Sequence, residues 1–116
     1  MTETMLFSVL WRSAVLRHGR AEWGSTLRLV LLVIGGVVLD EKGTVEISMQ
    51  RIAQYSGLTP DTVQRRLAKA FASGTVRGWL TRRKMRNQYG HRSYVYQCHI
   101  PADIDLRRLW FEDDGF

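Results

Sequence analysis

The segment Ser48–Phe71, SMQRIAQYSGLTPDTVQRRLAKAF, contains the start and stop signals of two short helices. Its first residue can cap a helix over Met49–Ser56, and Gly57 stands where a left-handed residue ends such a helix. Thr59 is the expected N-cap of the second helix, with Pro60 at the first helical position, where a missing N–H does no harm. The segment therefore predicts two helices joined by a turn of about three residues.

The spacing of apolar residues assigns an inner face to each helix. In the first helix we expect Ile52, Ala53 and Tyr55 to face inward, with Leu58 filling the corner. The inner stripe of the second helix follows the spacing i, i+4, i+7, i+8 and consists of Val63, Leu67, Ala70 and Phe71. Its opposite face is polar and consists of Asp61, Thr62, Arg65, Ala68 and Lys69, with Gln64 and Arg66 on the flanks.

Basic residues are concentrated in this part of the chain. The 116 residues include 17 Lys and Arg against 11 Asp and Glu, a net charge of +6. Between Thr62 and Ala102 there are nine basic residues and no acidic one, whereas Asp103–Phe116 has five acids against two arginines. So concentrated a basic segment favours a polyanionic partner, most commonly nucleic acid, over a merely solvated surface.

A small residue, a glycine, an apolar residue and a hydroxyl cap at fixed spacing form a known pattern. Here it consists of Ala53, Gly57, Leu58, Thr59, Thr62-Val63 and Leu67. The pattern resembles the helix-turn-helix of winged-helix DNA-binding proteins. LTPDTVQRRL is similar to the DNA-binding domains of GntR-type regulators and to helix-turn-helix modules of bacterial plasmid and phage replication or regulatory proteins.

A β-hairpin is expected after the second helix. Trp79–Met85 is rich in apolar and aromatic residues, Ser93–Ile100 alternates with a period of two, and the connector between them contains the Asn and Gly that hairpin loops favour. The resemblance implies that this hairpin is the wing. Thr75-Val76-Arg77 follows Gly74 where such families commonly have an apolar pair, so the first strand begins late or is bent.

The N-terminal part predicts two helices. Met5–Arg17 has a broad apolar stripe, and its helix should end near His18-Gly19. Ser25 or Thr26 can cap a second helix, buried all round, over the apolar run Leu27–Leu39. Within this run, Gly35-Gly36 predicts a close packing contact or an early helix end, because glycine disfavours a helix interior.

A turn over Asp40–Gly43 and a short strand with Val45 and Ile47 facing one way should follow the second helix. The expected fold is α+β, mainly α: a winged helix-turn-helix over residues 25–101. An added N-terminal helix occupies residues 1–24, and an acidic tail with a short helical segment occupies residues 102–116.

The resemblance implies DNA contacts from the second helix and the wing. Arg65 is the best candidate for a bidentate contact with guanine, and Gln64 could contact adenine, whereas Arg66 is expected to contact phosphate or to lie at the edge of the core rather than to contact a base. The expected recognition-helix contacts are Thr59, Asp61, Thr62, Gln64, Arg65, Arg66 and Lys69, although Asp61 fits a capping role better. The expected wing contacts, to phosphate or the minor groove, are Arg82, Arg83, Lys84, Arg86, Asn87, Tyr89, His91 and Arg92.

Other chemistry is poorly supported. Cys98 and His99 are adjacent on a strand and so point to opposite faces, which does not suit a metal site, and Cys98 is expected in the core. We expect no metal, no cofactor and no enzymatic activity, because phosphate-loop, nucleophile-elbow and buried acid-pair patterns are missing. Tyr55, Tyr94 and Tyr96 could stack bases, but core packing explains them more simply.

The expected partner is double-stranded DNA, bound with sequence preference by a small transcriptional regulator of a bacterium, plasmid or phage. The alternatives are a DNA replication or partition accessory factor, and a winged-helix module for protein or RNA. The single cysteine allows no disulfide within the chain, which fits a reducing cytoplasm. The longest apolar run, Leu27–Leu39, is shorter than a bilayer span and includes Arg28, and the N-terminus has the reverse charge order of a secretory signal, so the expected location is cytoplasmic. The few residues after the wing leave no room for an effector domain, so no small-molecule effector is expected.

Self-association is also expected, because one helix-turn-helix contacts only about half a site. The terminal segments have more large apolar residues than a surface tail needs, and either close the monomer's core or form a dimer seam. The seam is the favoured interpretation, and its expected residues are Leu6, Phe7, Leu10 and Trp11.

Overall fold

The computed structural model describes residues 2–86 and 92–106, with only the backbone at Arg86 and Arg92. Its helices are α1 (Glu3–His18), the 3-10 turn η1 (Ala21–Trp23), α2 (Gly24–Gly36), α3 (Met49–Ser56) and α4 (Pro60–Ser73). Its strands are β1 (Thr44–Ile47), β2 (Leu80–Arg86) and β3 (Arg92–Cys98). The strands form one antiparallel sheet in the order β1-β3-β2, so the fold is α+β and mainly helical, as expected.

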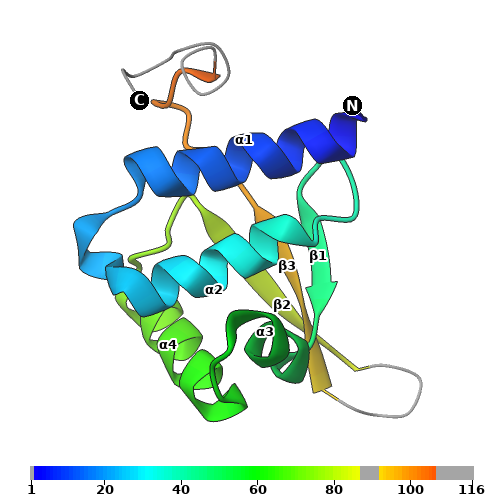
Figure 1. Ribbon diagram of the computed structural model, residues 1–116, viewed down its shortest axis with the longest axis vertical. Coiled ribbons are helices and arrows are strands. Elements are labelled where there is room, and N and C mark those ends of the chain that lie inside the picture. Colours follow the sequence, from blue (N-terminus) through cyan, green and yellow to red (C-terminus); the bar gives the residue numbers. More distant parts are fainter. Residues whose placement is uncertain (1, 87–91, 107–116) are drawn as a thin grey trace.

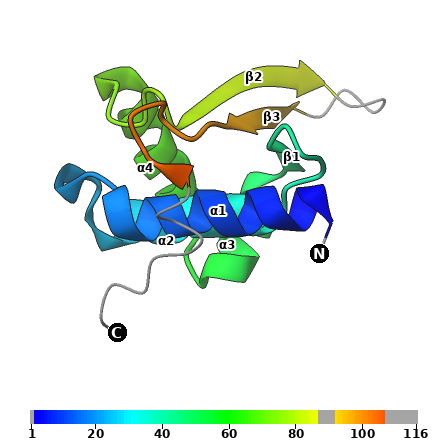
Figure 2. The ribbon, with the colours of Figure 1, turned by 90° about the horizontal axis from the view of Figure 1, so that it is seen from above.

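The helices and the sheet form two layers. Helices α1 and α2 run beside each other at one end of the molecule, and α3 and α4 lie beyond α2 (Figure 1). Seen from above, the β2–β3 hairpin runs along the side opposite α1 (Figure 2). Helix α2 thus separates α3 and α4 from α1 (Figure 1), whereas the open end of the hairpin reaches α1, where Trp11 donates to the carbonyls of Trp79 and His99.

The turn between α3 and α4 forms as the sequence predicts. The Ser48 hydroxyl accepts a hydrogen bond from the Arg51 amide, and Gly57 ends α3 with a φ of 76°. The Thr59 hydroxyl accepts from the Thr62 amide at 3.2 Å, and Pro60 is the first residue of α4. These local bonds satisfy the amides that a helix start leaves unpaired, which fixes where both helices begin.

Three tryptophans hold the core together at the ends of the elements. Trp11 is fully buried, and its indole N–H donates to the His99 carbonyl at 2.9 Å. Trp23 packs edge-to-face on Trp79, with ring centroids 5.1 Å apart, and its indole N–H donates to the Thr75 carbonyl at 2.7 Å. Apolar rings with a satisfied N–H thus connect α1 and η1 to the strand ends.

The glycine pair of α2 has both effects expected of it. A Cβ on Gly35 would lie 2.5 Å from the Trp11 ring, so only glycine lets α1 approach this closely. The helix then ends at Gly36. The turn at Asp40 is also confirmed, since its carboxylate accepts from the amides of Lys42 and Thr44, bonds that lower the pKa of Asp40.

Three expectations are wrong. Trp11 cannot belong to a dimer seam, because it is buried in the chain's own core, and Phe7 and Leu10 pack against that core from α1. Neither Ser25 nor Thr26 caps α2, because this helix begins at Gly24, directly after η1. The third wrong expectation concerns an aromatic ring of α3. Tyr55 does not face inward: its side chain is exposed and its hydroxyl accepts from Arg51.

Candidate nucleic-acid interface

Helix α4 presents a basic face because its apolar stripe is fixed inward. Val63 and Leu67 are fully buried and Ala70 is almost so, which determines the rotation of the helix about its axis. The side chains of Gln64, Arg65, Arg66 and Lys69 are consequently exposed. Four of the recognition-helix residues expected from the sequence are thus brought together on one solvent-facing surface.

A hollow of about 410 Å³ lies on this face, lined by Thr62, Arg65, Arg66 and Lys69. Arg66 and Lys69 have no hydrogen bond or ion pair within residues 2–86 and 92–106. Unpaired cations beside a hydroxyl are the groups that phosphate oxygens bind in protein–DNA complexes. The hollow therefore has the chemistry of a phosphate contact.

Side chains in the first turn of α4 bond to one another and to the helix backbone. The hydroxyl of Thr59 caps the helix and lies 2.9 Å from the hydroxyl of Thr62. Asp61 and Arg65 form an i, i+4 ion pair at 3.0 Å, but both side chains are more than 70% exposed, at 77% and 72%. Such an exposed pair contributes little energy, so Arg65 can leave Asp61 at low cost, which the expected contact with guanine would require.

The register of the hairpin separates its cations between two faces. Leu80 is buried opposite Cys98, Arg82 lies opposite Tyr96, and Lys84 lies opposite Tyr94. Since side chains alternate along a strand, Arg82 and Lys84 share the helix-facing side of the sheet and Arg83 lies on the other side. Only Lys84 and Arg83 are exposed among these three cations.

Arg82 is engaged with aromatic rings. Its guanidinium carbon lies 4.5 Å from the ring centroid of Phe71, in α4, and 4.3 Å from that of Tyr94, in β3. The sequence suggested only a phosphate contact here, and no spacing pattern predicts the stacking, because the two rings are 23 residues apart in the chain. The phosphate contact of Arg82 stays a prediction.

Part of the expected wing lies outside the described residues. Asn87, Tyr89 and His91 fall in 87–91, and the side chains of Arg86 and Arg92 are not described either. The backbones of Arg86 and Arg92 pair, so the strand register that the sequence left open is settled up to this point. Strand β2 begins at Leu80, which confirms the late start expected after Gly74.

The predicted core residues of the hairpin have strongly altered acidity. Cys98 is buried, as expected, and burial raises the pKa of its thiol to about 12. Burial also raises the pKa of Tyr96 to about 12, an effect that the nearby charge of Arg82 partly offsets. Neither group can serve as a nucleophile or base near neutral pH, because both keep their protons.

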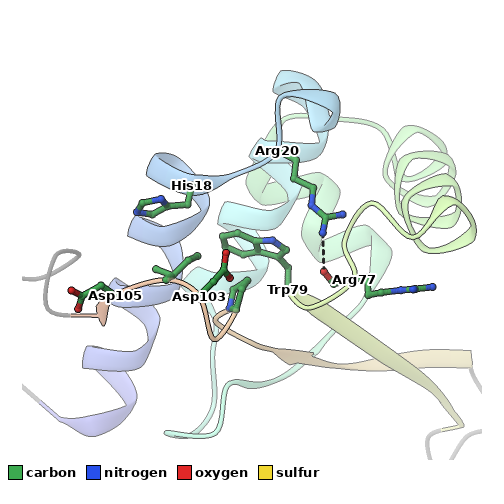
Figure 3. A pocket seen from close by; sticks show the side chains of 8 residues that line it. His18, Arg20, Arg77, Trp79, Asp103 and Asp105 are labelled. Atoms are coloured by element: carbon green, nitrogen blue, oxygen red, sulfur yellow. Dashed lines mark hydrogen bonds between the residues drawn. The ribbon is translucent and has the colours of Figure 1, made fainter.

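A separate pocket of about 360 Å³ lies between the end of α1, the loop before β2 and the segment after β3. Its charged side chains do not converge. Figure 3 shows Arg77 extending away from the pocket and the guanidinium of Arg20 turned to the Arg77 carbonyl. Arg20 also donates to the Thr75 carbonyl at 3.0 Å. Its role is thus to hold the loop that follows α4.

Residues 2–86 and 92–106 contain no group of three or more His, Cys, Asp or Glu that could hold a metal ion. No helix in these ranges has the length and apolar content needed to cross a bilayer.

Comparison of the chain with protein-family models, with curated proteins and with solved structures finds no significant match.

Proposed function

We propose that this chain is a winged-helix protein that binds double-stranded DNA with sequence preference, with α4 in the major groove and the β2–β3 hairpin on the flanking backbone. The role that suits it is a small transcriptional regulator of a bacterium, plasmid or phage. The main supporting observation is the exposed face of α4, where Arg65, Arg66 and Lys69 stand beside the hollow at Thr62. A major groove about 12 Å wide admits one such helix.

The arrangement of elements supports the same proposal. The β2–β3 hairpin directly follows α4, which is where the resemblance expects the wing, and it forms one sheet with β1. The face of α4 is polar, whereas a surface that docks on a protein has apolar anchors at its centre. DNA is therefore a better partner for this face than an acidic protein.

Selection from a random duplex pool tests the proposal. Enrichment of a sequence motif is expected, and Arg65→Ala should cost about 1 to 3 kcal/mol of binding free energy on that motif and less on random duplex. Lys69→Ala is the matched control on the same helix, and should weaken both duplexes alike. A pool with no enriched motif and no duplex affinity would contradict the proposal.

Self-association belongs to the proposal, because paired recognition helices would contact two half-sites about one DNA turn apart. With Trp11 in the core, the apolar residues left exposed on α1 are Met5 and Leu16, at 56% and 59% exposure. Sedimentation of the intact chain at micromolar concentration should show a dimer. A monomer that binds one asymmetric site would remove this part of the proposal.

A further inference from the structure

Among the described cations of β2, Arg82 is the one whose side chain makes ring contacts with other elements in residues 2–86 and 92–106. Its guanidinium lies between Phe71, near the end of α4, and Tyr94, on the neighbouring strand, with ring-centroid distances of 4.5 and 4.3 Å. Arg82 is half-buried. One side chain thus connects the basic helix to both strands of the hairpin.

Lys84 provides the contrast within the same strand. It lies two residues further along the same face of the sheet, and it is exposed. No hydrogen bond, ion pair or ring contact holds it within the described part of the chain. Of the two cations that face α4, one is thus committed to rings and the other is available to a phosphate.

The position of Arg82 matters because two separate elements must meet one duplex. Binding by α4 and by the hairpin at the same time requires a fixed distance between them. A loosely held hairpin would lose conformational entropy on binding, which would weaken the affinity. A planar guanidinium stacks on aromatic faces better than an ammonium does. To reach a phosphate, Arg82 would also have to leave both rings.

We propose that Arg82 is a positioning residue, which holds the β2–β3 hairpin against α4 by stacking between Phe71 and Tyr94, while Lys84 makes the phosphate contact on this face. The proposal rests on duplex-DNA binding as the function of the chain. The arginine preorganises the interface without touching DNA.

Two readouts separate positioning from phosphate contact. Arg82→Gln removes the charge, and Phe71→Leu removes one ring with no change of charge. If Arg82 acts through the rings, each variant lowers duplex affinity on the order of tenfold or less, and the double variant is little worse than either single one. The slope of log affinity against log salt stays at the wild-type value in all three variants.

Lys84→Gln is the matched control, because it removes one charge from the same face of the same strand. It should reduce the magnitude of the salt slope by about 0.9, the value for one lost phosphate contact, and its effect should be additive with that of Phe71→Leu. If Arg82→Gln instead reduces the slope as Lys84→Gln does and is additive with Phe71→Leu, the positioning role is overturned.

Urea unfolding of the same variants keeps the two proposals distinguishable, because it needs no DNA. Non-additive loss of stability for Arg82→Gln and Phe71→Leu would show that the stacking exists in solution. If that coupling is present but the intact chain has no duplex affinity, the proposed function fails and the positioning role in DNA binding fails with it. Additive stability effects would overturn the positioning role alone.

Discussion

The arginines of the α1–α2 region and those of α4 differ in what their guanidinium groups bind. Arg28 donates to the carbonyls of Val15, Gly19 and Arg20 at 3.1 to 3.2 Å, and so satisfies the end of α1. Arg66, on α4, is exposed and has no such bond within the described residues. Arg28 is thus bound to the backbone of its own region, whereas on α4 Arg66 is exposed and Arg65 makes only an exposed ion pair with Asp61.

The difference shows that net charge alone does not locate a binding surface. Arg28 binds carbonyls at the end of α1, Arg82 stacks on aromatic rings, and Arg66 faces solvent, although all three are arginines. The environment that decides between these roles comes from elements distant in the chain. If the two regions differ in this way, substitutions near α1 and α2 should affect folding, and substitutions on the exposed face of α4 should affect binding.

The largest expected effect is on the core that α1 completes. Trp11→Ala should lower the free energy of unfolding by about 3 to 5 kcal/mol, because it removes a fully buried ring and its indole bond to His99. Leu16→Ala, on the exposed side of the same helix, is the control and should change it by about 0.5 kcal/mol or less. Urea unfolding measures both, and equal effects would contradict the assignment of α1 to the monomer's core.

The arginine pair tests the comparison itself. Arg28→Met should lower the free energy of unfolding by about 1 to 3 kcal/mol, because carbonyls at the end of α1 lose their donor. Arg66→Met should leave unfolding nearly unchanged and weaken duplex binding. Unfolding and DNA titrations on both variants would measure this, and a reversed pattern would show that the two regions are assigned the wrong way round.

Local signals predicted the helix-turn-helix segment well. The cap at Thr59, the proline after it and the left-handed Gly57 depend only on neighbours in sequence, and all are confirmed. The strand register was open because it depends on pairing across the hairpin. The position of Trp11 could not be predicted either, since its partners at Trp79 and His99 are far along the chain.

The sequence predicted only the part of the candidate site that depends on local signals. The exposed face of α4 follows from helical periodicity, which needs only the positions of Val63 and Leu67. The stacking of Arg82 follows from where α4 meets the sheet, which periodicity does not give. The start of α2 was also misplaced, because η1 precedes it directly and takes the place of a side-chain cap.

A smaller effect concerns the neutral, buried groups of β3. The folded-state pKa values of Cys98 and Tyr96 are raised to about 12, from 9.0 and 10.0. Stability from these groups is therefore complete below pH 9 and is lost as the pH rises toward 12, because the unfolded chain releases its protons first. Unfolding free energy should fall by about 1 to 2 kcal/mol between pH 7 and pH 10.

Cys98→Ala separates the thiol from other alkaline effects. The variant should be less stable at pH 7 but lose less stability on going to pH 10, because one of the two groups is gone. A decline of the same size in the variant and the parent chain would show that the thiol is not protected by burial. A decline that begins below pH 8 would point to other groups.

The salt dependence of duplex binding tests the central claim most directly, because it measures how many cations of the basic region meet phosphate. With roughly five to seven phosphate contacts per protomer, log affinity should fall against log salt with a slope of about −4 to −6 per protomer. Arg66→Met should reduce the magnitude of that slope by about one, and Arg28→Met should leave it unchanged. A slope near zero for the intact chain would contradict the claim that the α4 face and the hairpin form a DNA-binding surface.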